Sequence, residues 1–118
     1  MIDKAERAVD YLKHILQPIG QIERYTADMS EHNFLADELT QDAVIRNFEI
    51  IGEASRNIER NCPEFAAAHP DLPLLNAYEM RNALAHGYFR VDLEIVWKTI
   101  QNDLHSLRRQ INAIVKEP

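Results

Sequence analysis

The segment from residue 81 to residue 88 contains three side chains whose types suit chemistry on a phosphodiester. Arg81, His86 and Tyr88 stand within eight residues of one another. Histidine has an unperturbed pKa of about 6.5, so it can accept or donate a proton at neutral pH. Arginine stays protonated and offers paired donors to phosphate oxygens, which stabilises the negative charge of a transition state. These residue types fit RNA cleavage in which the 2′-hydroxyl attacks the neighbouring phosphate.

Spacing alone does not bring Arg81 and His86 together. Five residues of α-helix turn through about 500°, so two side chains five positions apart point about 140° away from each other. They converge only if Gly87 allows the last turn to open, or if the long Arg81 side chain reaches around the helix. Taken singly, Arg81 is more typical of a surface ion pair, His86 of a helix C-terminus and Tyr88 of a half-buried aromatic.

Four helices are expected to position these residues, because apolar residues recur every three or four positions in four segments. The first spans roughly residues 3–25, where Pro18 predicts a kink or break near residues 14–18. The second runs from Asp37 or Thr40, each a plausible N-cap, to about residue 60. The third spans about 72–86, with Asp71 as its candidate cap, and the fourth continues from Asp92 to about 115.

The apolar residues of these segments define the expected core. For the first helix they are Ala5, Val9, Leu12, Leu16 and Ile19. For the second the stripe is Val44, Phe48, Ile51, Ser55 and Ile58. The fourth has a long 4-3 spacing through Leu93, Trp97, Ile100, Leu104, Leu107, Ile111 and Ile114. That narrow stripe suits packing against another long helix, either in the same chain or in a second copy.

The sequence therefore predicts an all-α, antiparallel four-helix up-and-down bundle with a short extra helical or loop segment, forming one domain over residues 1–118. Strand-like alternation and β-hairpin turn signals do not occur in it. Pro63, Pro70 and Pro73 are expected to punctuate a connecting loop between the second and third helices.

Composition places the chain among ordinary globular proteins, with 46% hydrophobic and 27% charged residues over 118 positions. The single cysteine, Cys62, cannot form an internal disulfide. No run approaches the roughly 20 apolar residues of a membrane span, and the charged N-terminus does not match a signal peptide. We therefore expect a cytoplasmic protein. The net charge of −6 argues against non-specific coating of nucleic acid, but not against a local RNA site.

The residues around Arg81 resemble a known family. Arg81-Asn82-x-x-x-His86-x-Tyr88 matches the Arg-x4-His-x-Tyr signature of HEPN-domain proteins, specifically the HepT-like toxins. The likeness extends over the flanking segments Met80-Arg81-Asn82, Phe89–Trp97, Ile51-Gly52-Glu53-Ala54 and Ile22-Glu23-Arg24-Tyr25. It therefore covers all four expected helices and essentially the whole chain.

The resemblance implies a metal-independent endoribonuclease toxin that needs no cofactor and works as a homodimer on RNA. Its catalytic residues would be Arg81 and His86, with Asn82 as a polar supporting residue. Its partner would be a nucleotidyltransferase antitoxin of the MNT type, which silences the toxin by transferring AMP to Tyr88. Neither a membrane nor DNA is an expected partner. A two-fold dimer would bring a second Arg81/His86 set nearby, so that one His acts as base and the other as acid.

The sequence leaves a second interpretation open. Related helical bundles also serve as non-catalytic modules that dock onto a nucleotidyltransferase and help it hold substrate, so the fold alone does not decide between the two functions. The complete set of Arg81, His86 and Tyr88 favours the ribonuclease, because a docking module would not need all three. A purely structural dimerisation bundle would explain the 4-3 stripe but not residues 81–88.

Overall fold

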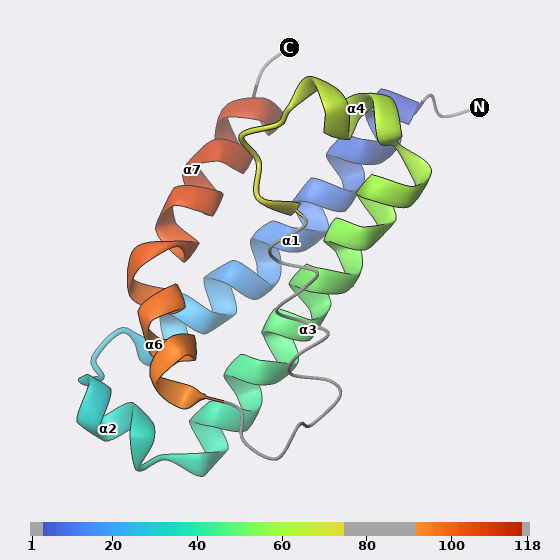
Figure 1. Cartoon of the computed structure of the whole chain (residues 1–118). Coiled ribbons are helices and arrows are strands. Elements are labelled where there is room, and N and C mark those ends of the chain that lie inside the picture. Colours follow the sequence, from blue (N-terminus) through green and yellow to red (C-terminus); the bar gives the residue numbers. More distant parts are fainter. Residues whose placement is uncertain (1–3, 75–91, 117–118) are drawn as a thin grey trace.

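The computed structural model describes residues 4–74 and 92–116, and these residues form helices joined by short turns (Figure 1). The helices are α1 (Lys4–Thr26), α2 (Glu31–Leu35), α3 (Glu38–Asn61), α4 (Pro63–Ala68), α6 (Leu93–Asn102) and α7 (Leu104–Val115). α1 and α3 run antiparallel as a long hairpin, α7 packs against α1, and α6 contacts α7 and α2 (Figure 1). The predicted all-α class is confirmed.

α1 forms because one of its faces is wholly apolar. Its fully buried side chains are Ala8, Leu12, Ile15, Ile19 and Ile22. This face is rotated slightly from the predicted stripe, so that Val9 and Leu16 lie at its partly buried edge. The helix continues through Pro18 without a break. Proline removes one backbone donor, and the buried isoleucines on both sides of Pro18 hold the helix against α3 and α7.

α3 begins at a side-chain cap. Asp37 Oδ1 accepts a hydrogen bond from the Thr40 backbone N–H at 3.0 Å, and the Thr40 hydroxyl donates to Oδ2 at 2.9 Å. Asp37 is thus the N-cap, one of the two predicted starts. These bonds, the backbone one first, hold the pKa of the Asp37 carboxyl below its ordinary value of 3.8. The predicted stripe of α3 is confirmed, since all five of its residues are buried.

Residues 63–68 correct the predicted loop, because they form the short helix α4. Pro63 stands at its first position, where the missing N–H costs nothing and the fixed φ suits a helix. The alanines that follow favour helix as well. Cys62 joins α3 to α4 and is buried at 1% exposure, as expected for a small apolar residue at a helix end.

The predicted fourth helix is interrupted once, at Asp103, and consists of α6 and α7. Asn102 and Asp103 both favour non-helical backbone through their side chains, which explains an interruption at this point. The interruption is slight, since the Asp103 N–H still bonds to the Thr99 carbonyl at 2.9 Å. α6 begins after Asp92, as predicted, and the Asp92 side chain caps it. Leu104, Leu107 and Ile111 are buried on α7, which packs against α1.

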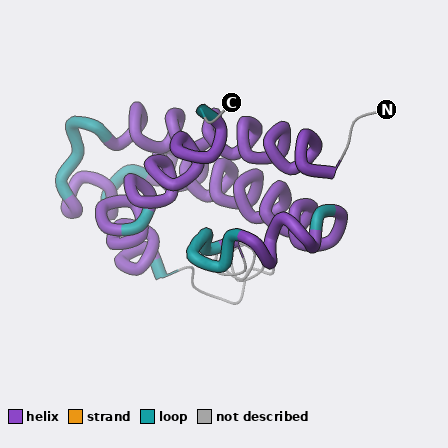
Figure 2. The backbone as a smooth tube through the Cα atoms, turned by 90° about the horizontal axis from the view of Figure 1, so that it is seen from above, coloured by secondary structure: helices purple, strands orange, loops and turns teal. Residues whose placement is uncertain are grey.

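α2 closes one end of the bundle. Its one buried residue is Phe34, whose ring lies 5.4 Å from that of Trp97 on α6, at a tilt of 33°. The Gln41 side chain donates to the Phe34 carbonyl at 2.9 Å and so ties α2 to α3. Viewed from above, the turn segments lie at the ends of the helices (Figure 2). Among the described residues, none of the helices has the length and apolarity needed to cross a membrane.

Candidate active site

The predicted site residues Arg81, Asn82, His86 and Tyr88 lie outside the described residues. So does most of the predicted helix over 72–86. What the structure defines is how the chain enters and leaves the segment that carries the motif.

The chain enters this segment from the hydrophobic core. Leu72 and Leu74, which follow α4, have exposed fractions of 6% and 2%. The Gln110 side chain of α7 donates a hydrogen bond to the Asp71 carbonyl at 2.8 Å, across 39 positions of sequence. Because two buried leucines and a bond to α7 hold residues 71–74, the N-terminal side of the motif segment starts from a fixed point.

The chain leaves the segment at the start of α6, where Asp92 forms the N-cap. Asp92 Oδ1 accepts hydrogen bonds from the backbone N–H groups of Glu94 and Ile95 at 3.1 and 3.3 Å. One turn further along α6, Trp97 packs on Phe34. The entry lies beside α7, and the exit lies next to α2 at the other end of the bundle (Figure 1). Both ends of the motif segment are therefore attached to packed helices.

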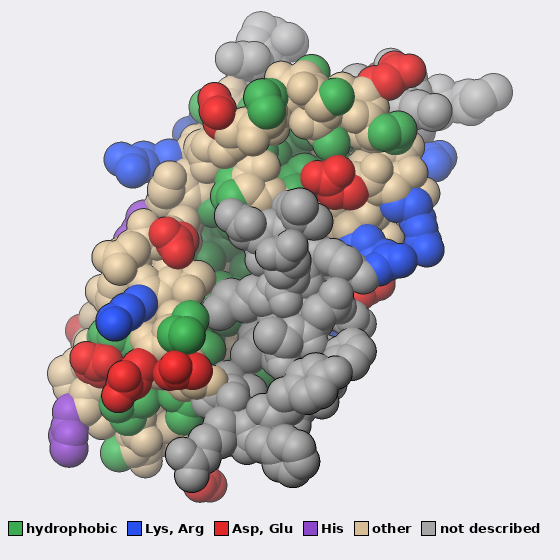
Figure 3. All heavy atoms as spheres, in the orientation of Figure 1, with side chains coloured by type: hydrophobic (Ala, Val, Ile, Leu, Met, Phe, Trp, Pro, Cys, Tyr) green, Lys and Arg blue, Asp and Glu red, His purple; other side chains and the backbone are tan. Residues whose placement is uncertain are grey.

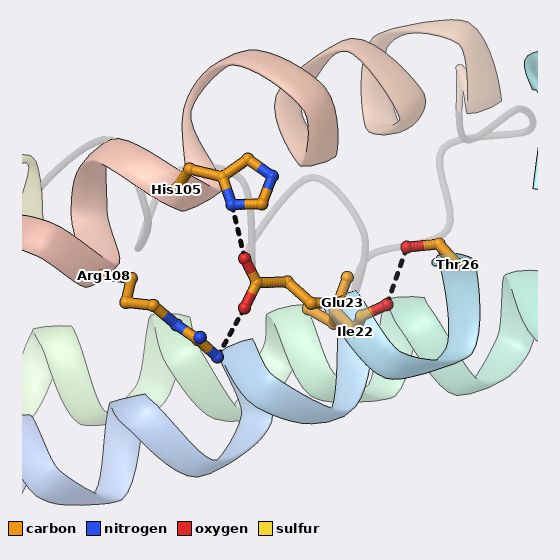
Figure 4. A network of polar contacts seen from close by, with 5 residues as sticks. All are labelled: Ile22, Glu23, Thr26, His105 and Arg108. Atoms are coloured by element: carbon orange, nitrogen blue, oxygen red, sulfur yellow. Dashed lines mark hydrogen bonds and ion pairs between the residues drawn. The ribbon is translucent and has the colours of Figure 1, made fainter. Parts of the chain in front are cut away.

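A polar cluster that sequence reasoning missed links α1 to α7 (Figure 4). His105 Nδ1 lies 2.6 Å from Glu23 Oε2, and Arg108 forms an ion pair with Glu23 Oε1. The Glu23 side chain is 17% exposed, whereas those of His105 and Arg108 are 60% and 40% exposed. The arginine lies close to Gly20, where an added Cβ would be 3.4 Å from an Arg108 nitrogen, at the edge of ordinary van der Waals contact.

This cluster is suited to holding two helices together. Glu23 engages both basic side chains, so part of the Arg108 guanidinium is already bound within the protein. Only one feature of the sequence pointed to this cluster: His105 and Arg108 stand three positions apart, on one face of a helix. Their shared partner stands more than 80 positions earlier in the chain, and the sequence pattern gave no reason to pair it with them.

The described residues contain no group of three or more His, Cys, Asp or Glu side chains placed to hold a metal ion. His14, His32 and His105 are exposed. His69 is half-buried, stacks on Phe65 at 4.2 Å and bonds through Nδ1 to the Phe65 carbonyl.

Comparison with known proteins decides the family. The sequence model of the family described as "Ribonuclease HepT-like" matches residues 15–114, which is most of the chain. The chain belongs to the HepT-like ribonuclease family. The matched range runs from α1 to the last turns of α7 and contains the positions of all four predicted site residues. The identification therefore agrees with the resemblance that the motif and its flanks indicated.

Individual HepT-like relatives are similar over almost the whole chain. A protein of Thermococcus cleftensis named "Probable ribonuclease HepT" is 42% identical over 91% of this chain and 94% of its own length. A Methanocaldococcus jannaschii protein named as a gamma-glutamylcyclotransferase and RNase is 41% identical over 91% of this chain but only 47% of its own length. An RNase-named protein of Caldanaerobacter subterraneus is 34% identical over 91% of this chain and 93% of its own. No solved structure matches this chain.

Proposed function

We propose that this HepT-like chain is a metal-independent endoribonuclease that acts as the toxin of a toxin–antitoxin pair. Arg81 stabilises the charge on the phosphate and His86 transfers the proton, while Asn82 supports them through polar contacts. The 2′-hydroxyl of RNA attacks the adjacent phosphorus, and the 5′-oxygen leaves with a proton. The observation that carries the proposal is the family match over residues 15–114, which contains the complete Arg-x4-His-x-Tyr motif together with its flanks.

The chain supplies a single motif histidine, and the reaction needs both a base and an acid. In our proposal a homodimer brings two motifs to one site, so that one His86 removes the proton from the 2′-hydroxyl and the other protonates the leaving oxygen. A dimer with a single intact His86 would then have far less than half of the wild-type rate. A rate of half or more in such a heterodimer would show that each protomer works alone.

The antitoxin in this proposal is a nucleotidyltransferase that transfers AMP to Tyr88. The phenol oxygen attacks the α-phosphate of ATP, pyrophosphate leaves, and the hydroxyl proton is lost to solvent. Modification places a charged nucleotide two positions from His86 and so blocks access of RNA. Tyr88→Phe should retain RNA cleavage but gain no AMP on incubation with the transferase and ATP, as measured by intact-protein mass spectrometry.

The deciding experiment measures cleavage of total RNA by purified protein in the presence of EDTA, together with growth after induced expression. Wild type is compared with Arg81→Ala and His86→Ala, and with His32→Ala as a matched exposed control. Cleavage and growth arrest should vanish in the first two variants and persist in the third, with all variants folded. Cleavage that survives in both motif variants would remove the proposed site. Inactivity of the wild type itself would favour the non-catalytic nucleotidyltransferase-docking module.

A further inference from the structure

The exposed large hydrophobic side chains among the described residues all lie at one end of the bundle. They are Tyr25 at the end of α1, Leu35 at the end of α2, Leu39 at the start of α3 and Ile95 at the start of α6. Leu39 is 82% exposed and Ile95 is 56% exposed. We call residues 25–45 and 92–97, which surround α2 in Figure 1, the α2 end. Large apolar side chains exposed at one end of a domain are a common feature of protein contact surfaces.

The acidic excess of the chain is found at the same end. Residues 25–45 and 92–97 contain seven of the 19 acidic residues and none of the 13 Lys and Arg residues. They are Asp28, Glu31, Asp37, Glu38, Asp42, Asp92 and Glu94. The rest of the chain then has 12 acidic and 13 basic side chains, so the net charge of −6 arises here. Figure 3 shows acidic side chains beside hydrophobic ones at this end (lower left).

Helix capping explains only part of this pattern. Asp37 and Asp92 are N-caps, and acidic residues in a first helical turn are favoured by the helix dipole. Those roles do not require Leu39 or Ile95 to be apolar and exposed. Arg24, just outside the α2 end, lies over the Tyr25 ring at 5.6 Å. The five acidic residues that do not cap a helix are all exposed: Asp28, Glu31, Glu38, Asp42 and Glu94.

We infer that the α2 end is the docking surface for a protein partner whose own contact surface is basic and contains apolar side chains. RNA does not fit, because its phosphates would face seven carboxylates. A second copy docked through the same face does not fit either, because like charges would oppose each other. A basic protein surface complements the charge, and apolar side chains on it can cover Leu35, Leu39 and Ile95.

The inference rests on the proposed function, in which the partner is the nucleotidyltransferase. Asp92, part of the α2 end, stands four residues beyond Tyr88. Four residues of fully extended chain span at most about 14 Å. Tyr88 therefore lies within about that distance of Asp92, and a transferase that contacts Asp92 is near the tyrosine it modifies. Docking there would place the partner beside its target without needing contacts to the motif itself.

The test uses the purified full chain and the purified nucleotidyltransferase encoded beside it, with binding measured by calorimetry and modification by mass spectrometry. One variant removes the apolar contacts, Leu39→Gln with Ile95→Gln. A second removes charge, Asp28→Asn with Glu31→Gln and Asp42→Asn. Matched controls make the same kinds of change near the opposite end: Ala67→Gln with Ala113→Gln, and Asp10→Asn with Glu59→Gln and Glu64→Gln. All of these positions are exposed, so the variants should fold.

The apolar double variant should weaken binding at least tenfold and slow AMP transfer in proportion, while its RNA cleavage stays at the wild-type rate. The charge variant should slow association and flatten the dependence of the Kd on NaCl concentration. Both controls should bind as the wild type does. Wild-type binding by both α2-end variants would overturn the inference and leave the proposed antitoxin in place. If wild-type protein itself does not bind the transferase, the proposed pairing fails, and the inference fails with it.

Discussion

Phe34 holds α2 against the rest of the bundle, so its truncation should destabilise the protein strongly. Its side chain is fully buried, and its ring packs 5.4 Å from that of Trp97. Phenylalanine-to-alanine changes in such sites cost about 3–5 kcal/mol of unfolding free energy. A domain of this size typically has about 5–15 kcal/mol in total. At about 4 °C per kcal/mol, Phe34→Ala should lower the Tm by roughly 10–20 °C.

The neighbouring residue provides the control. Leu35 follows Phe34 in the same short helix but is 38% exposed, so Leu35→Ala should cost less than about 1 kcal/mol. Phe34→Leu keeps an apolar side chain but loses the aromatic pair, and should fall between the two. Urea unfolding followed by far-UV circular dichroism measures all three. Equal and small losses for Phe34→Ala and Leu35→Ala would refute the packing of α2 on α6.

Three further predictions concern polar residues. Asp37→Asn keeps the cap of α3 but cannot titrate. The pKa of Asp37 in the folded protein is below 3.8, so wild type should be more stable than Asp37→Asn by a constant amount above that pH. This advantage should shrink as the pH falls below 3.8. An advantage that persists unchanged at about pH 2 in urea titrations would contradict this. Asp92→Ala removes the cap of α6 and should lower the free energy of unfolding by about 1 kcal/mol. Because α6 begins where the chain leaves the motif segment, the same change should reduce RNA cleavage. Asp92→Asn keeps a capping side chain and should restore both, whereas equal effects of the two changes would argue against a capping role. Glu23→Gln should lower the free energy of unfolding by about 1 kcal/mol at low salt and by less at 1 M NaCl. Arg46→Gln, which breaks an exposed ion pair with Glu49, should lower it by under about 0.5 kcal/mol in the same unfolding assay.

The sequence predicted the parts of the fold that depend on local pattern. Apolar spacing predicted the limits of α1 and α3, the buried stripe of α3 and the start of α6 after Asp92. The Asp37 cap was predicted because its side chain can bond to its own helix. The pattern of prolines predicts a loop where α4 forms, because proline commonly marks loops, although at the first position of a helix it is favourable. The interruption at Asp103 was missed because the apolar stripe continues through it.

Features that join distant segments could not be predicted in the same way. Glu23 pairs with His105 and Arg108 only because α1 and α7 are rotated to face each other, and that rotation is set by the whole core. The predicted site, in contrast, consists of residues that are close together in the sequence. Arg81, His86 and Tyr88 form one short motif, so the sequence was enough to predict them, and their roles stay predictions.

The position of the acidic residues explains how an acidic protein can act on RNA. The molecule is 47 Å long, whereas the screening length at physiological ionic strength is about 8 Å. The field of the α2 end is therefore largely screened beyond about 8 Å, and it repels only RNA that comes within about that distance of it. At about 0.01 M salt the screening length is about 30 Å, and the repulsion extends over most of the molecule.

The variant Asp28→Asn with Glu31→Gln and Asp42→Asn should therefore raise kcat/KM for RNA cleavage at 0.01 M salt but leave it unchanged at 0.15 M. A large increase at 0.15 M would mean instead that the RNA lies against the α2 end during cleavage.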